Sequence, residues 1–240
     1  MERTFQLYLY ETREFCEVLI SAETRTHFRA SLQVLDGACR LWGMTIAVQE
    51  EAFGWQLQIV TQGMPKRRVL GSYYAHRICT MANALGLGAR LAENPEAWSV
   101  QVGVPKRPPR LGETALAKQV QGIRFSDYVF LRNLSCPARE ADLEKIGFGN
   151  LFYALKFSLP KTLGFPWRLI LQRDTIEFHR FGNSMETAYC EAGALMAAFS
   201  QLMEQEGRAF TWRVTPQQGE HHFYACMALL ETYFPEWELA

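Results

Sequence analysis

Alternating and helical hydrophobic patterns follow one another along the first sixty residues. Residues 5–10 (FQLYLY) and 14–22 (EFCEVLISA) mix alternation with β-branched and aromatic residues, which predicts two strands. From Thr26, which can act as an N-cap, to Gly43 the apolar positions repeat every three or four residues and predict a helix. Residues 44–62 predict a hairpin that turns at the Phe-Gly pair in their middle.

A second helix and a further strand complete this half. Residues 67–86 carry an apolar stripe at helical spacing and end on a glycine that can close the helix. Residues 98–104 (WSVQVGV) predict a strand. Without the first strand the order is β-α-β-β-α-β, so we expect an α+β fold whose N-terminal half is a ferredoxin-like plait.

The second half predicts antiparallel hairpins packed on one long amphipathic helix. Its expected strands cover residues 125–134, 150–159, 167–173 and 175–181, and a closing hairpin covers residues 208–230. A short helix is expected over residues 137–147, where a proline occupies the first turn, and a long one over residues 183–207. This half is therefore expected to form a second α+β unit.

The Gly-Phe-Gly-Asn stretch at residues 147–150 raises the question of a phosphate-binding loop. It lacks the GxGxxG spacing, and it precedes an expected strand rather than a helix. We interpret it as a turn in which Gly147 closes the short helix and the chain enters the second sheet.

A proline-rich segment separates the two halves. Prolines in PKRPPRLGETALAKQVQG (residues 105–122) disfavour a helix at its start and favour an extended connection. We therefore expect a first domain over residues 1–104, a basic connection over 105–124 and a second domain over 125–240.

The composition suits a folded cytoplasmic protein. Of the 240 residues, 48% are hydrophobic and 13% aromatic, which is enough for a sizeable core. No apolar run approaches the roughly 20 residues of a membrane helix, and the N-terminus does not have a signal-peptide profile. The six cysteines are scattered without a CxxC pair, which predicts buried thiols in a reducing compartment.

Charge is balanced overall but uneven along the chain. Bases and acids both number 25, yet ten bases face only three acids between Pro65 and Arg124. Two clusters in this region, PKRR and PKRPPR, could contact phosphates or could be solvated loops. The candidate residues are Lys66, Arg67, Arg68, Lys106, Arg107 and Arg110.

No motif demands an enzyme. The sequence has no GxSxG, no HExxH and no histidine–cysteine spacing for a metal, and we expect neither a metal nor a cofactor. His27 lies in the first turn of the first expected helix. It could act as a general base on a ribose hydroxyl, or it could be an ordinary surface histidine.

The C-terminal half resembles the 4-vinyl reductase, or hydrocarbon-binding, domain family. The segments LEKIGFGNL, TIEFHRFGNS, CEAGALMAAFSQL, FTWRV and GEHHF follow the order of that family's elements. The resemblance implies a non-catalytic ligand-binding or sensor protein with an apolar pocket for a small aromatic or apolar molecule. The candidate pocket residues, which would equally suit an ordinary core, are Tyr189, Cys190, Met196, Phe210 and Trp212.

The chain departs from this family at its zinc site. Cys190 matches the family's helix cysteine, but Thr215, Gln217 and Phe223 stand where hairpin ligands are expected. A zinc site of that type is therefore not predicted.

The N-terminal half is similar to RAMP-type CRISPR-associated proteins, which bind or cut guide RNA. The similarity rests on the ferredoxin-like order, a histidine in the first helix, a basic strip after the last strand and a later Gly-Phe-Gly. It implies an RNA-binding protein and, if it cleaves, a metal-independent endoribonuclease. No glycine-rich loop follows the last helix, which departs from that family.

Three interpretations thus stay open from the sequence. The chain is a sensor for a small apolar ligand, an RNA-binding protein, or a scaffold subunit with neither activity. Any of these could act as a homodimer or in a larger complex, and none involves a membrane.

Overall fold

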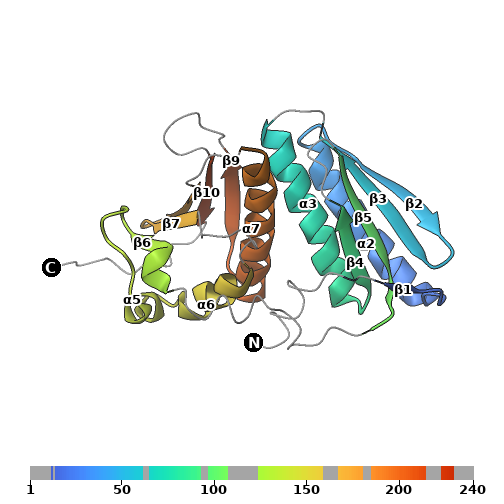
Figure 1. Cartoon of the computed structure of the whole chain (residues 1–240), viewed down its shortest axis with the longest axis horizontal. Helices are drawn as coiled ribbons and strands as arrows, with labels where there is room; N and C mark the ends of the chain where they lie inside the picture. The colour runs from blue at the N-terminus through green and yellow to red at the C-terminus, as the bar shows by residue number, and fades with distance from the viewer. Residues whose placement is uncertain are drawn as a thin grey trace. The chain divides into compact units, whose positions relative to one another are not determined.

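The computed structural model describes residues 12, 14–61, 65–92, 97–107, 124–158, 167–180, 185–214 and 223–229 (Figure 1). Contacts divide the chain into two compact units. Unit 1 comprises Met1–Glu113 and Tyr189–Ala197, and unit 2 comprises Thr114–Ala188 and Ala198–Ala240. No helix among the described residues is long and apolar enough to cross a membrane.

Unit 1 is built on an antiparallel sheet with two long helices. Its elements are β1 (Phe15–Cys16), α2 (Ala22–Arg40), β2 (Ile46–Glu51), β3 (Gly54–Val60), α3 (Pro65–Ala84), β4 (Gly88–Ala92) and β5 (Ala97–Pro105). The strand order is β1-β5-β3-β2, and β4 also pairs with β5. All of these pairings are antiparallel.

This strand order differs from the expected plait. A ferredoxin-like plait has its first strand inside the sheet, whereas here β1 is a two-residue strand at the end of the order, and β5 lies between it and β3. The short strand β4 was not predicted. The α+β class is confirmed, but the ferredoxin-like plait is not, and the strand expected at residues 5–10 lies outside the described residues.

Strict alternation places the core of unit 1 on one face of its sheet. Trp55 of β3 stands opposite Val102 of β5 in the register, and both are buried. The ring of Phe28, from α2, lies 4.5 Å from the ring of Trp55. The residues between them, such as Gln56 and Gln101, fall on the opposite face because strand side chains alternate.

Both helices of unit 1 begin before the positions expected from the pattern. Helix α2 starts at Ala22, because the Ser21 side chain accepts a hydrogen bond from the Thr24 amide (3.1 Å) and caps the first turn in place of Thr26. Helix α3 starts at Pro65, since proline is well suited to the first helical position.

Unit 2 is a mixed sheet with helices of very different length. Its elements are η1, a 3₁₀ turn (Phe125–Asp127), β6 (Val129–Leu131), α5 (Glu140–Lys145), α6 (Gly149–Ser158), β7 (Trp167–Leu171), β8 (Thr175–Arg180), β9 (Phe210–Val214), β10 (Phe223–Leu229) and α7 (Met185–Gln205), of which Tyr189–Ala197 belong to unit 1. The strand order is β6-β7-β8-β10-β9, with β6 and β7 parallel and the other pairs antiparallel. The long helix and the closing hairpin are therefore present as predicted.

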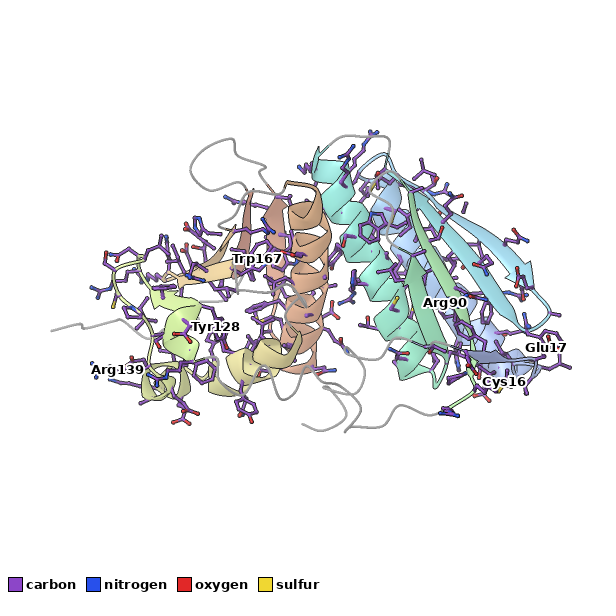
Figure 2. All side chains as sticks on the ribbon, viewed as in Figure 1. Cys16, Glu17, Arg90, Tyr128, Arg139 and Trp167 are labelled. Carbon is purple, nitrogen blue, oxygen red and sulfur yellow. The ribbon has the colours of Figure 1, made fainter. Side chains whose placement is uncertain are left out.

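Aromatic side chains fill the core of unit 2. The ring of Phe199, on α7, lies 5.2 Å from that of Phe178 on β8 and 5.8 Å from that of Phe152 on α6. The buried Tyr128 hydroxyl donates a hydrogen bond to the Phe152 carbonyl (3.0 Å), and Trp167 is completely buried (Figure 2). These edge-to-face and hydrogen-bonded contacts hold α6 against the sheet.

The prediction of a strand at residues 150–159 is wrong, because this segment is helix α6. Leu151, Phe152 and Leu155 are buried while Tyr153 is exposed, which is a helical rather than an alternating pattern. The Gly-Phe-Gly-Asn stretch therefore joins two short helices, with Gly147 in the left-handed region (φ 75°) at the end of α5.

Two glycines inside helices should respond oppositely to alanine. A Cβ on Gly71 would contact the Thr61 methyl group and lie 2.9 Å from Trp98 Cδ1, whereas a Cβ on Gly37 would meet nothing within 4 Å. We expect Gly71→Ala to lower the free energy of unfolding by about 1–3 kcal/mol through overpacking. Gly37→Ala should raise it by roughly 0.5–1 kcal/mol through helix propensity. Chemical denaturation measures both changes, and equal responses would contradict the close packing of α3.

Candidate functional site

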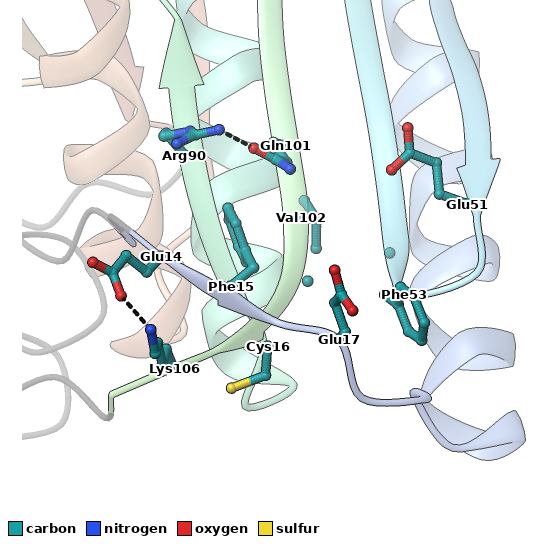
Figure 3. Close-up of a pocket in the computed structure, with 12 residues that line it drawn as sticks. Glu14, Phe15, Cys16, Glu17, Glu51, Phe53, Arg90, Gln101, Val102 and Lys106 are labelled. Carbon is teal, nitrogen blue, oxygen red and sulfur yellow. Dashed lines mark hydrogen bonds and ion pairs between the residues drawn. The ribbon is translucent and has the colours of Figure 1, made fainter.

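A hollow of about 470 Å³ opens on the sheet face of unit 1 opposite the buried tryptophans (Figure 3). The segment around β1 contributes Glu14, Phe15, Cys16 and Glu17, and the β2–β3 turn contributes Glu51, Phe53 and Gly54. Strands β4 and β5 and the residues just after β5 contribute Arg90, Gln101, Val102, Gly103 and Lys106.

Two glycines at one level of the sheet line this hollow. Gly54 of β3 and Gly88 of β4 both stand opposite Gly103 of β5 in the register; Gly54 and Gly103 line the hollow, whereas Thr12 covers Gly88. A Cβ on Gly103 would lie 3.0 Å from a ring carbon of Phe15. The missing side chains therefore let the Phe15 ring lie close over the sheet backbone.

Aromatic rings border the hollow on two sides. Figure 3 shows Phe15 beside β4 and β5 and Phe53 beside β3, with the Glu17 carboxylate between them. Arg90 donates a hydrogen bond to Gln101, and its guanidinium carbon lies 5.8 Å from the centroid of the Phe15 ring. Arg90 is thus positioned by a neighbour on β5 and by an aromatic face.

The charges around the hollow are only partly matched. Lys106 forms an exposed ion pair with Glu14 (3.0 Å), and this hydrogen bond together with the lysine charge holds the pKa of Glu14 below its ordinary value. Within the described part of the chain, neither Glu17 nor Glu51 has an ion-pair partner. Three acids and two bases line the hollow, so it carries a net charge of −1 at neutral pH.

The described cysteines differ more in exposure than the sequence predicted. Cys39 is buried, Cys16 and Cys79 are half-buried, and Cys136 is exposed. Cys16 is the described cysteine that lines the hollow. Burial, and to a smaller extent the charge of Asp36, raises the pKa of Cys39 to about 12.

The PKRR cluster forms the first turn of α3, not an extended strip. The Lys66 ammonium lies 4.4 Å from the centroid of the Trp42 ring, and a Cβ on Gly43 would meet the Arg67 guanidinium. Both cations therefore lie at the end of α2, where the partial negative charge of the helix terminus favours them. Arg68 follows them in the same turn.

The other residues of the RNA-binding hypothesis lie on separate elements. Lys106 lines the hollow and Arg107 is an exposed residue that follows β5, while Arg110 falls outside the described residues. His27 is exposed on α2 and does not line the hollow.

The residues proposed to line an apolar pocket are described only in part. The Trp212 ring lies 6.4 Å from that of Phe210 and 5.1 Å from that of Phe178, and its Nε1 donates to the Ser200 hydroxyl (2.8 Å). Met196 is buried in α7. The side chains of Tyr189 and Cys190, in the first turns of α7, are outside the described set, and a ligand role for all five residues stays a prediction.

Sequence reasoning missed the hollow almost completely. Of its lining, only Lys106 was among the candidates, because Glu17, Phe53 and Arg90 come from segments with no recognisable motif. The sequence feature that could have indicated the hollow is a glycine within or at the end of each of the strands β3, β4 and β5. A glycine in a strand often marks the close approach of another group.

Comparison with known proteins identifies the fold and corrects the family assignment. No family model and no curated protein matches the sequence. The structure is similar to the crystal structure of a Thermotoga maritima protein described as a nitroreductase, with a TM-score of 0.62 and 12% sequence identity. The likeness covers 95% of this chain and 92% of that one. The chain therefore has a nitroreductase-like α+β fold.

The resemblances to the 4-vinyl reductase family and to RAMP-type proteins are accordingly wrong, and so are the sensor and RNA-binding functions drawn from them. Both rested on the order of short elements, which many α+β folds share. One of those elements, the expected strand at residues 150–159, is a helix. The predicted homodimer or larger complex stays a prediction.

Thiol labelling should distinguish the described cysteines. At pH 8, iodoacetamide should modify Cys136 and Cys16, because their thiols reach solvent. Cys39 should stay unmodified until denaturant is added, because its thiolate is almost absent below its raised pKa. Peptide mass spectrometry over time measures each site, and modification of Cys39 as fast as Cys136 would contradict its burial.

Proposed function

We propose that this chain is an oxidoreductase of small nitroaromatic compounds and that the hollow of unit 1 is a binding site for the nitro compound. The observation that carries the proposal is the fold likeness, over 95% of the chain, to a protein described as a nitroreductase. A shared fold alone leaves the reaction open, so the site must supply the rest.

The volume of the hollow suits a small aromatic molecule. Its volume of about 470 Å³ is within the range of small-molecule sites. Gly54 and Gly103 line the hollow without side chains, the Phe15 ring lies close to Gly103, and Phe15 and Phe53 border the space. An aromatic ring that enters the hollow can contact either phenyl ring in an offset or edge-to-face arrangement.

Arg90 is suited to orient the nitro group. A nitro group presents two oxygen acceptors in one plane, and a guanidinium presents paired donors in one plane. The contact with Gln101 holds the Arg90 side chain on the β4 side of the hollow, so less freedom is lost when a ligand binds.

Reduction also needs an electron donor. Conversion of a nitro to a nitroso group consumes two electrons and two protons and releases water, chemistry that flavin and nicotinamide cofactors supply. Both cofactors carry phosphate, but the hollow has three carboxylates, and Lys106 is already paired with Glu14. The described residues of the hollow therefore do not fit such a cofactor, so the hollow is assigned substrate binding alone and no redox step is placed in it.

The proposal is tested with the purified full chain. We expect 4-nitrobenzyl alcohol to be consumed with NADH or NADPH, with or without added flavin, as followed by chromatography of substrate and product. An absorption spectrum of the purified protein shows whether a flavin is retained. Absence of reduction with every donor would contradict the proposed function.

Substitution of Arg90 tests the substrate site. Arg90→Gln removes the charged donor, so we expect KM for the nitro compound to rise about tenfold with a smaller change in kcat. Arg173→Gln, an exposed position in unit 2 that does not line the hollow, should behave like the parent protein. Equal effects of the two variants would show that Arg90 does not bind the substrate.

A further inference from the structure

The lining of the hollow has one more acidic than basic side chain, which favours a positively charged substrate. We propose that the hollow selects an aromatic compound bearing an organic cation, an ammonium group in the simplest case. The inference rests on the proposed function, which it deepens by naming the charge of the substrate.

Two carboxylates that line the hollow have no ion-pair partner among the described residues. Glu14 and Lys106 form an ion pair, and Arg90 is positioned by Gln101 and Phe15. Glu17 and Glu51 line the same hollow without an ion-pair partner in the described part of the chain. Each would gain electrostatic energy from a cation that enters the hollow.

The sheet register places Glu51 on the face of the sheet that carries the hollow. Glu51 stands opposite Gly54, which lines the hollow, so the two residues project from the same side of the sheet. Glu17 lies between Phe15 and Phe53 in Figure 3. Both carboxylates thus border one space, although they come from different segments.

The aromatic rings distinguish an organic cation from a metal ion. Phenyl faces attract ammonium groups through the negative charge of the π system, and an aromatic border beside a carboxylate is a recurrent ammonium site. Among the described residues, no three acidic, cysteine or histidine side chains are grouped closely enough to hold a metal. The chemistry of the hollow therefore favours an alkylammonium over a bare cation.

The charges are also polarised across the hollow. Arg90 lies on the β4 side, whereas Glu17 and Glu51 lie toward β3 and the β2–β3 turn (Figure 3). A molecule with a nitro group at one end and an ammonium group at the other would satisfy both sides. An anionic substituent on the side of Glu17 and Glu51 would be repelled.

A matched ligand series tests the inference without any reaction. Binding of 4-nitrobenzylamine, 4-nitrobenzyl alcohol and 4-nitrobenzoate is measured by calorimetry on the full chain with no reductant. We expect the amine to bind about fivefold more tightly than the alcohol, since one close charge pair in water has about that effect. The benzoate, whose carboxylate can pair with Arg90, reports on that side of the hollow. The preference should shrink as salt is added.

Variants that remove one carboxylate identify which residues cause the preference for the amine. Glu17→Gln and Glu51→Gln should each reduce the preference for the amine by about twofold while leaving the affinity for the alcohol unchanged. Glu23→Gln, an exposed position on α2 that does not line the hollow, is the matched control and should keep the preference. Circular dichroism checks that each variant is folded.

The outcomes separate this inference from the proposed function. Equal affinity for all three compounds, or loss of the preference in Glu23→Gln alone, would overturn the charge selection even if all three are reduced. Tighter binding of the amine with no reduction by any donor would support the charge selection and contradict the proposed function.

Discussion

Burial of one face of the unit 1 sheet is the constraint on which the candidate site depends. Trp55 and Val102 face the core, and Phe28 of α2 packs on Trp55, so the alternate positions of the same strands must face away. On the open face, Gly54 and Gly103 have no side chains, which lets the Phe15 ring lie close to the β5 backbone.

The local sequence around β1 then shapes the hollow. Phe15 and Cys16 pair with the end of β5, and this pairing brings Phe15 over Gly103 and Glu17 to the rim. The charges follow from the same arrangement. An ion pair neutralises one carboxylate, and the two that remain give the hollow its negative character.

Strongly periodic segments were predictable from the sequence, and short ambiguous ones were not. Helices α2, α3 and α7 and the β2–β3 hairpin were found because their patterns extend over many residues. Strand β4 was missed because GARLA has no β-branched residue and only five positions. Helix α6 was taken for a strand because its apolar run, residues 151–155, is too short to show a decisive period.

The sequence by itself determined the α+β class, most helices and the separation of apolar from polar strand positions, because these depend on neighbours along the chain. The tertiary structure decided the strand order, the position of the basic turn at the end of α2 and the hollow. Gly54 and Gly103 are far apart in sequence and come together only because β3 pairs with β5. The local hydrophobic pattern does not specify which distant strand becomes the neighbour.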